Sequence, residues 1–195
     1  STKMSLEKNE IVTVPGAKSL ADGISVRTPG NLCFEYIKKY VDDVITVTED
    51  EITHSIFMLM ERAKLVTEGA GAVPLAAILA DKLNFKGKNI VSLISGGNID
   101  IAMIEKIIDR ELVRQTRRLR FTIEIQDKVG QLGSLVTNIV SLGANIVKTR
   151  QDNNWNEKGL DYAYVSFEVE VQSKEHADIL VDKLRERGYN LELSR

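Results

Sequence analysis

The stretch Asn-Ile-Val-Ser-Leu-Ile-Ser-Gly-Gly-Asn at residues 89–98 places an apolar segment directly before a pair of glycines. The apolar run at 89–94 predicts a buried strand, and isoleucines at helical spacing predict a helix over Ile99–Glu111. A strand that leads through glycines into a helix is typical of α/β proteins, in which ligands bind at the carboxyl ends of strands. The glycine turn at 95–98 is therefore the first candidate binding site.

The residue types in this turn suit a flat or anionic ligand. Two glycines let the backbone approach a ligand closely, and a helix start offers free N–H groups at the positive end of its dipole. The Ser95 hydroxyl can hydrogen bond with a ring nitrogen or a phosphate oxygen. A purely structural turn has the same pattern, so the turn alone does not identify a ligand.

A second candidate is Glu68-Gly-Ala-Gly71, which also lies between two expected elements. Its small residues allow close approach, and Glu68 would supply a charge at a pocket. The alternative is a helix cap with a carboxylate that faces solvent. Dispersed glycines without a lysine do not make a phosphate-binding loop.

Signals of the same α/β pattern precede these motifs. Short strands are expected at Glu10–Val14 and Val44–Val47. Thr48-Glu-Asp-Glu51 has the form of a capping box and predicts the start of an amphipathic helix. Two further helices are expected, one over residues 31–40 with Asn31 as its cap and one that is rich in alanine over Ala72–Leu83.

The second part of the chain follows a different period. Apolar and polar residues alternate strictly over 119–125 and again over 163–171, which predicts strands with one covered face. Two helices and two more strands, with a polar turn at Asp152–Gly159, complete the order β-α-β-β-α-β of a ferredoxin-like unit. We therefore expect an α/β protein of two domains, residues 1–115 and 116–195.

Composition excludes several classes of protein. The 195 residues include 26 basic and 28 acidic side chains, and this balance argues against nucleic-acid and membrane-surface partners. Cys33 is the only cysteine, and with His54 and His176 it cannot complete a four-ligand zinc site, so no metal is expected. No apolar run is long enough to span a bilayer, and the first residues lack the apolar core of a signal peptide. A cytoplasmic protein is expected.

Several motifs of the first part occur in the order of one known family. These motifs are Leu20-Ala-Asp-Gly23, Arg27-Thr-Pro-Gly-Asn-Leu32, Val47-Thr-Glu-Asp-Glu-Ile52, Val66-Thr-Glu-Gly-Ala-Gly-Ala72 and Ile94-Ser-Gly-Gly-Asn-Ile-Asp100. Together they resemble the C-terminal part of threonine ammonia-lyases (threonine dehydratases) and of the related serine dehydratases and serine racemases. The resemblance implies part of the pyridoxal-phosphate fold type II, which is similar to the tryptophan synthase β chain.

This resemblance implies a pyridoxal 5'-phosphate site and the residues that line it. Ser95 would bond the pyridine nitrogen, Gly23 would lie against the cofactor, and Glu68 would lie near its ring. Gly96, Gly97 and Asn98 would complete this wall of the site. A hydroxyl partner leaves the ring nitrogen largely neutral, which suits β-elimination of a hydroxyl group.

The catalytic lysine of the family has no counterpart in this chain. The family carries it in an N-terminal motif, together with a glycine-rich loop that holds the cofactor phosphate, and the resemblance places both before residue 1. A nucleophilic lysine is required for the covalent chemistry of this cofactor. We therefore expect the chain to be the C-terminal part of a longer enzyme, with no catalytic residue of its own and no activity alone.

The second part resembles the ACT domain, a small regulatory module that binds amino acids. Asp127-Lys-Val-Gly-Gln-Leu132 is similar to the Asp-x-Pro-Gly-x-Leu motif of that module, with Val129 in place of the proline. Gly143-Ala-Asn-Ile146 is similar to its second motif. The resemblance implies that an effector contacts Gly130, Leu132, Asn145 and Ile146 at the interface of paired domains.

Two hypotheses about function follow. In the first, the parent enzyme deaminates L-threonine to 2-oxobutanoate and ammonia, in isoleucine biosynthesis or threonine catabolism. It would be a homo-oligomer through both domains, with a small effector such as an amino acid acting through the ACT domain. In the second, the chain is a non-catalytic protein for amino-acid sensing or oligomerisation that keeps a degenerate dehydratase half. The intact motifs at 68–71 and 95–98 favour the first.

Overall fold

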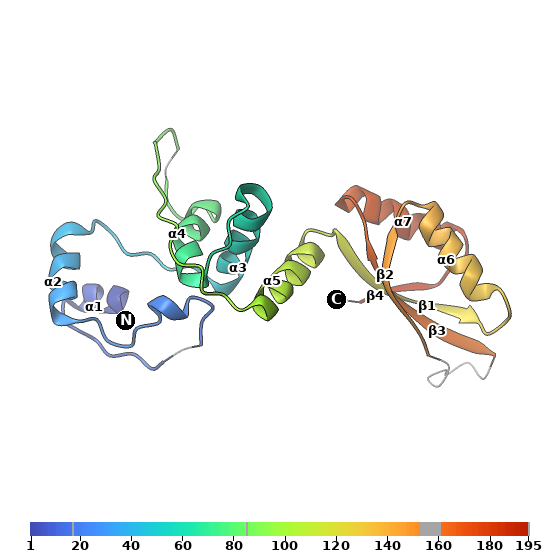
Figure 1. Ribbon diagram of the computed structural model, residues 1–195, viewed down its shortest axis with the longest axis horizontal. Helices are drawn as coiled ribbons and strands as arrows, with labels where there is room; N and C mark the ends of the chain where they lie inside the picture. The colour runs from blue at the N-terminus through green and yellow to red at the C-terminus, as the bar shows by residue number, and fades with distance from the viewer. Residues whose placement is uncertain (17, 85, 153–160, 195) are drawn as a thin grey trace. The chain divides into compact units, whose positions relative to one another are not determined.

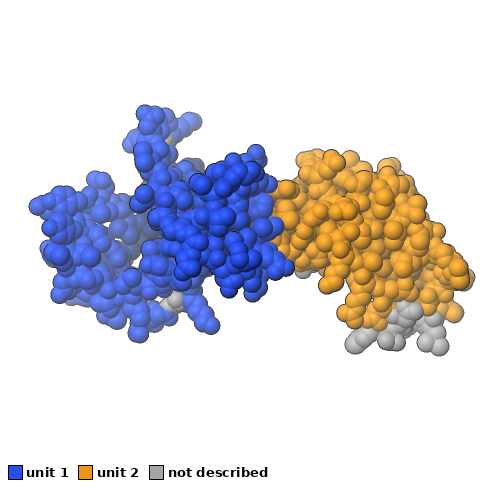
Figure 2. Space-filling model, viewed as in Figure 1, with its two compact units in different colours: residues 1–108 blue, residues 109–195 orange. Residues whose placement is uncertain are grey.

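The protein is described by a computed structural model over residues 1–16, 18–84, 86–152 and 161–194. The chain divides into two compact units, Ser1–Ile108 and Asp109–Arg195 (Figure 2). The division falls inside the helix α5, Ile101–Arg114, whereas the sequence places the domain boundary just after this helix, at Thr116.

The first unit consists of helices joined by extended segments (Figure 1). Its helices before α5 are α1 Thr2–Lys8, η1 Asp22–Ile24, α2 Asn31–Tyr40, α3 Glu49–Met58, η2 Leu59–Ala63 and α4 Gly69–Leu79. The helices α3 and α4 pack side by side, with Ile52 and Ile56 of the first and Ala72 and Ala76 of the second almost fully buried. The small side chains of α4 allow this close packing, which makes the α3–α4 pair the core that supports the surrounding loops.

The predicted capping box of α3 is confirmed. The Thr48 hydroxyl accepts a hydrogen bond from the Glu51 N–H at 3.3 Å, and the Glu51 carboxylate accepts one from the Thr48 N–H at 2.7 Å. Two orphan donors of the helix start are thereby satisfied.

The three strands expected in this unit are absent from its described residues. Residues 10–14, 44–47 and 89–94 are extended but belong to no sheet. A strand needs a ladder of hydrogen bonds to a neighbour, and within the described part of this unit these segments have none. The prediction of strands at these three places is therefore wrong for the described residues.

Helix boundaries in this unit also differ from the predictions. The helix α2 begins at Asn31 with Gly30 as its N-cap, so Asn31 is not the cap. The alanine-rich helix α4 begins at Gly69, and α5 begins at Ile101 because Asp100 caps it: Asp100 Oδ1 accepts from the Ala102 N–H at 2.8 Å. Local hydrogen bonds determine the first residue of each helix, and hydrophobic periodicity does not predict these bonds.

The second unit has the predicted β-α-β-β-α-β order. Its elements after α5 are β1 Arg118–Gln126, α6 Gln131–Ser141, β2 Asn145–Asp152, β3 Tyr162–Glu170, α7 Lys174–Glu186 and β4 Leu191–Ser194. The strands form one antiparallel sheet in the order β2-β3-β1-β4, as a ferredoxin-like unit requires. Of the polar turn predicted after β2, residues 153–159 lie outside the described residues.

The core of this unit lies between the sheet and its two helices, which cover the same face (Figure 1). Alternate residues of β1 and β3 are buried, including Phe121 and Phe167, whose rings stack with centroids 5.6 Å apart. Leu135 of α6 and Leu180 of α7 are fully buried against them. The strict alternation in the sequence thus correctly predicts which face of each strand is covered.

Among the described residues, no helix combines the length and the apolar character that a membrane span requires.

Candidate functional site

The site in the first unit is centred on Glu68, the N-cap residue of α4. Its Oε2 atom accepts a hydrogen bond from the Asn98 N–H at 3.3 Å, although the two residues are 30 positions apart. Its backbone N–H points to the Gly96 carbonyl oxygen at 3.4 Å, and its carbonyl accepts from the Ala72 N–H at 3.2 Å. The predicted motifs at 68–71 and 95–98 therefore meet in space.

Glycines at two positions allow the backbone to lie directly against the Glu68 carboxylate. Gly96 has a φ of +68°, and a Cβ at this position would lie 2.5 Å from Glu68 Oε1. A Cβ at Gly23 would lie 3.4 Å from the same oxygen and 3.2 Å from the Cβ of Ala70. The structure thus brings Gly23, Glu68 and the turn at 95–98 together, which spacing in the sequence does not predict.

The segment that carries Gly23 is held by the start of α3. The Ser19 hydroxyl donates to Glu49 Oε1 at 2.7 Å, and the Leu20 N–H donates to Glu49 Oε2 at 2.9 Å. A Cβ at Gly69 would collide with the Leu20 carbonyl, so the bare backbone of α4 lets this segment pack against the helix. The core pair α3–α4 therefore positions the 20–23 segment.

Thr67 is a further residue of the site that no motif of the sequence predicts. Its side chain is buried, and its hydroxyl lies 3.2 Å from the Ser95 carbonyl oxygen and 3.1 Å from that of Gly96. A Cβ at Gly71 would overlap the same Ser95 carbonyl oxygen. The only sequence signal is a hydroxyl residue directly before the Glu-Gly-Ala-Gly motif, which does not indicate a partner.

The arrangement offers a flat surface beside an open hydroxyl. Ser95 is exposed, and within the described part of the chain its hydroxyl has no hydrogen-bond partner. Next to it lie glycine backbone and the half-buried carboxylate of Glu68. These groups can contact a planar ligand that carries a hydrogen-bonding ring atom.

One element of the predicted chemistry is wrong. The isoleucine spacing predicts a helix start, with its free N–H groups, directly after Asn98. The helix begins at Ile101, and Asp100 accepts hydrogen bonds from the N–H groups of Ala102, Met103 and Ile104. Three N–H groups of the first turn of α5 that could bind an anion are thus already used.

The second unit separates the four predicted effector contacts. Gly130, with a φ of +88°, is the N-cap of α6 and follows the end of β1, while Asn145 begins β2. Asn145 pairs with Glu170, which pairs with Arg118 at the other end of β1. The eight residue steps along β1 correspond to roughly 26 Å, so the two ends of the sheet are far apart.

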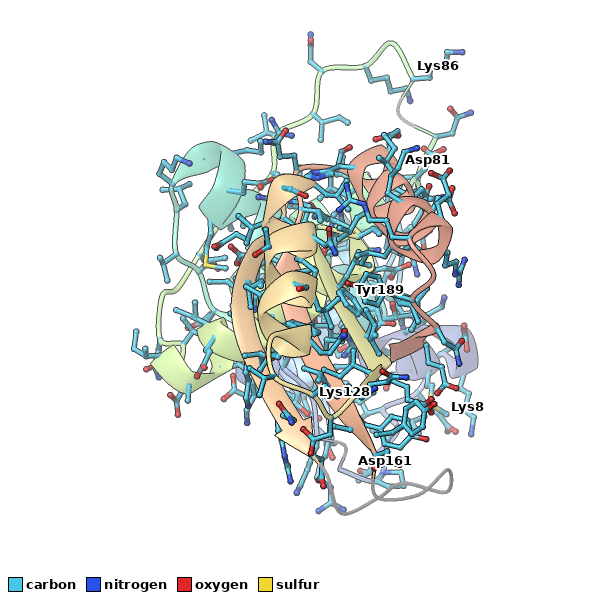
Figure 3. All side chains as sticks on the ribbon, turned by 90° about the vertical axis from the view of Figure 1, so that its right-hand side faces the viewer. Lys8, Asp81, Lys86, Lys128, Asp161 and Tyr189 are labelled. Carbon is cyan, nitrogen blue, oxygen red and sulfur yellow. The ribbon has the colours of Figure 1, made fainter. Side chains whose placement is uncertain are left out.

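The side chains at these two ends have separate surroundings. Near Gly130, the Asp127 N–H donates to the Asp161 carbonyl at 2.8 Å, and Figure 3 shows Lys128 and Asp161 at the same end of the sheet. Leu132 and Ile146 are half-buried and pack against the core. A single chain therefore brings together neither Gly130 and Asn145 nor the motifs that contain them.

Among the described residues, no group of three or more histidine, cysteine, aspartate or glutamate side chains could hold a metal ion.

Comparison with known proteins indicates the class that the first unit resembles. Residues 2–96 match the family described as pyridoxal-phosphate dependent enzyme. The first unit is therefore similar to a segment of this family, and pyridoxal phosphate is the cofactor that the family uses. The Ser95 hydroxyl, which is exposed and has no hydrogen-bond partner among the described residues, fits a ring atom of this cofactor, whereas the positions that a Cβ would fill at Gly23 and Gly96 face Glu68.

One relative matches nearly the whole chain and another matches about half of it. An L-threonine ammonia-lyase of Thermotoga maritima is 39% identical over 189 residues, which are 97% of this chain and 47% of that protein. A catabolic L-threonine dehydratase of Staphylococcus aureus is 48% identical over 97 residues, 48% of this chain and 28% of that protein. The chain is thus similar to threonine ammonia-lyases. It spans about half the length of the curated relatives that match nearly all of its residues.

A solved structure shows the same likeness. The processed form of threonine deaminase isoform 2 from Solanum lycopersicum is 26% identical, with a TM-score of 0.50 over 56% of this chain and 31% of that chain.

Proposed function

We propose that this chain forms one wall of the cofactor site of a pyridoxal-phosphate dependent ammonia-lyase that acts on L-threonine. The observation that carries the proposal is the meeting of Gly23, Glu68 and the turn at 95–98, in which the exposed Ser95 hydroxyl has no hydrogen-bond partner among the described residues. The identity of 39% with a threonine ammonia-lyase over nearly the whole chain supports it.

The residues of the site have distinct roles in this proposal. The Ser95 hydroxyl hydrogen bonds with the pyridine nitrogen, and the backbone of Gly23, Gly96 and Gly97 lies against the cofactor. Asn98 holds the Glu68 carboxylate in place through its backbone N–H. When bound, pyridoxal phosphate supplies the electron sink for β-elimination of the hydroxyl group of L-threonine, which yields 2-oxobutanoate and ammonia.

The choice of a serine has a chemical consequence. A hydroxyl does not carry the negative charge that would keep a proton on the ring nitrogen, whereas a carboxylate does. The ring is then a weaker electron sink, which is sufficient when the leaving hydroxyl takes up the developing charge. None of the motifs in this chain supplies the lysine that holds the cofactor covalently, so we assign lyase activity to a larger enzyme and none to residues 1–195 alone.

The test uses the protein as its gene encodes it. With L-threonine and pyridoxal phosphate present, we expect 2-oxobutanoate and ammonia, and we expect Ser95→Ala to raise the dissociation constant of pyridoxal phosphate about tenfold, as loss of a hydrogen bond to a ligand would. Ser134→Ala, at an exposed serine of the second unit, is the matched control. A protein that binds an amino acid but neither binds pyridoxal phosphate nor releases ammonia would instead be the non-catalytic sensor.

We also propose that the second unit is an ACT-type regulatory module that binds an amino acid between two copies of the chain. Gly130 and Leu132 lie at one end of the sheet, and Asn145 and Ile146 begin at the other. An effector that contacts both motifs therefore needs one motif from each of two copies. Homo-oligomerisation is thus part of this proposal.

Calorimetry tests the regulatory module. Titration with isoleucine, valine and serine is expected to give heat of binding with at least one of them, and Asn145→Ala is expected to weaken that binding about tenfold. The control is Asn190→Ala, at an exposed asparagine of the same unit. Binding to a monomer, as measured by sedimentation, would rule out the shared site.

A further inference from the structure

Thr67 is among the most deeply buried polar residues of the first unit. Its exposed fraction is 1%, and its hydroxyl lies within hydrogen-bond distance of three carbonyl oxygens, those of Glu68 (3.3 Å), Ser95 (3.2 Å) and Gly96 (3.1 Å). A hydroxyl has a single hydrogen to donate, so the three acceptors share it. Two of the three belong to the segment that carries the Ser95 hydroxyl.

That segment has little else to hold it. Residues 89–100 lie in neither a helix nor a strand, so no ladder of backbone hydrogen bonds fixes their conformation. Its bonds with Glu68, from the Glu68 N–H to Gly96 and from the Asn98 N–H to Glu68, measure 3.4 and 3.3 Å, and the contacts of the Thr67 hydroxyl measure 3.1 to 3.3 Å. The segment is therefore held by a few contacts of similar length, of which those of Thr67 are buried.

Gly71 completes the contact from the side of α4. A Cβ at this position would overlap the Ser95 carbonyl oxygen and would lie 2.5 Å from the Thr67 hydroxyl. The Ser95 carbonyl is therefore held between the bare backbone of Gly71 and the hydroxyl of Thr67. Because the Ser95 carbonyl and side chain share one Cα, fixing the carbonyl restricts where the side-chain hydroxyl can point.

We propose that Thr67 is a positioning residue of the cofactor site, which holds the Ser95–Gly96 backbone so that the Ser95 hydroxyl faces the pyridine nitrogen. This inference rests on the proposed function, in which Ser95 contacts the cofactor. Thr67 itself is buried beneath the segment and acts through Ser95.

The experiment compares Thr67→Val, which keeps the shape and removes the donor, with Thr67→Ser, which keeps the donor. The protein is used as its gene encodes it, and the readouts are the dissociation constant of pyridoxal phosphate and the absorption spectrum of the bound cofactor. Thr53→Val is the matched control, because Thr53 is also buried and donates at 2.8 Å to Glu49, away from residues 95–98.

We expect Thr67→Val to raise the dissociation constant about tenfold and to shift the absorption spectrum in the same direction as Ser95→Ala does. Thr67→Ser and Thr53→Val are expected to leave both readouts within about twofold of the wild type. When Ser95→Ala is already present, Thr67→Val is expected to add little, because residues that act through one another are not additive.

The outcomes separate this inference from the proposed function. A wild-type protein that binds no pyridoxal phosphate overturns both. A wild-type protein that binds it, with Thr67→Val unchanged or with the two substitutions fully additive, overturns the role of Thr67 alone.

Thr67→Val could also bind the cofactor weakly because the variant folds poorly. A second measurement distinguishes this folding defect from a loss of positioning. In the absence of cofactor, Thr67→Ala is expected to speed amide hydrogen exchange at Gly96 and Gly97 about tenfold while leaving the amides of α3 unchanged. Equal acceleration throughout the first unit would show a general structural role and overturn the proposal.

Discussion

At the scale of single residues, two helical glycines of this chain have opposite surroundings. Gly71 in α4 faces the Ser95 carbonyl, which a Cβ would overlap, whereas Gly133 in α6 has no atom within 4 Å of the same position. Glycine in a helix is less favourable than alanine because the unfolded chain loses more conformational freedom. Only at Gly71 does close approach of another backbone require the glycine.

We therefore expect Gly71→Ala to destabilise the first unit by about 1–3 kcal/mol, as overpacking does. Gly133→Ala is expected to stabilise the second unit by about 0.4–1 kcal/mol. Urea unfolding, followed through amide signals of α4 and α6 separately, measures both. A Gly71→Ala protein as stable as the wild type would contradict the packing described for the Ser95 segment.

Also at the residue scale, Glu170 carries a pH dependence. Arg118 donates to Glu170 Oε1 at 2.7 Å, and this hydrogen bond is the main reason that the pKa of Glu170 lies below its usual value of 4.5. Burial acts in the opposite direction, and the Asn145 amide adds a weaker stabilisation of the carboxylate. The folded protein thus binds this proton less tightly than the unfolded chain does.

It follows that the Glu170 carboxylate stabilises the second unit above about pH 4.5 and that this contribution is lost as the pH falls below that value. Because the side chain is 41% exposed, we expect no more than about 1 kcal/mol. Urea unfolding at pH 7 to 3 should show a smaller loss of stability in Glu170→Gln than in the wild type. Glu192→Gln is the control, and equal slopes in all three proteins would refute the effect.

At the scale of elements, α7 is a mostly polar helix that packs against the sheet through one apolar face. Ala177, Leu180, Val181 and Leu184 are buried against the sheet, while Ile179 between them is 55% exposed. The burial follows the 3.6-residue period rather than the hydrophobicity of each residue. Adjacent isoleucine and leucine residues therefore differ in what they contribute to stability.

Leu180→Ala is expected to destabilise the second unit by about 2–5 kcal/mol, since it removes a fully buried side chain and leaves a cavity. Ile179→Ala, one position away, is expected to change the free energy of unfolding by less than about 0.5 kcal/mol. Chemical denaturation of the two variants makes the comparison. Similar losses would mean that α7 packs on a different face.

The elements of the first unit depend on more distant contacts. Its extended segments at 44–47 and 89–94 have strand-like sequences but no paired neighbour among the described residues. Leu32, Tyr36 and Tyr40 of α2 lie at helical spacing, yet all three are more than half exposed, and Phe34 is the buried residue of that helix. Local patterns in this unit therefore predict conformation better than burial.

At the scale of the whole molecule, the second unit contains a complete core of its own. Its sheet has all four strands paired in the spatial order β2-β3-β1-β4, and both of its covering helices come from the same segment of chain. A unit with a self-contained core can fold without the remainder of the chain.

We expect a chain of residues 109–195 to fold alone into this four-stranded unit and to unfold cooperatively. Circular dichroism with urea titration measures cooperativity, and protected amides in β1 and β3 would identify the sheet. A gradual transition without protected amides would show that the first unit is required for folding.

Sequence alone determines much of this protein. The alternation over 119–125 and 163–171 predicts the ferredoxin-like order and its buried face, and Thr48 with Glu51 predicts the start of α3. The motifs at 68–71 and 95–98 predict the cofactor through resemblance to a family. These signals depend on residues that are only a few positions apart, so they can be recognised in the sequence.

Tertiary structure decides which of these segments meet. The contacts of Glu68 with Gly23 and Asn98, and of Thr67 with Ser95, join positions 28 to 45 residues apart. The same structure places Gly130 and Asn145, only 15 positions apart, at opposite ends of a sheet. Packing of small residues against backbone determines the contacts in the first unit, and the length of β1 separates Gly130 from Asn145. No local period in the sequence encodes either.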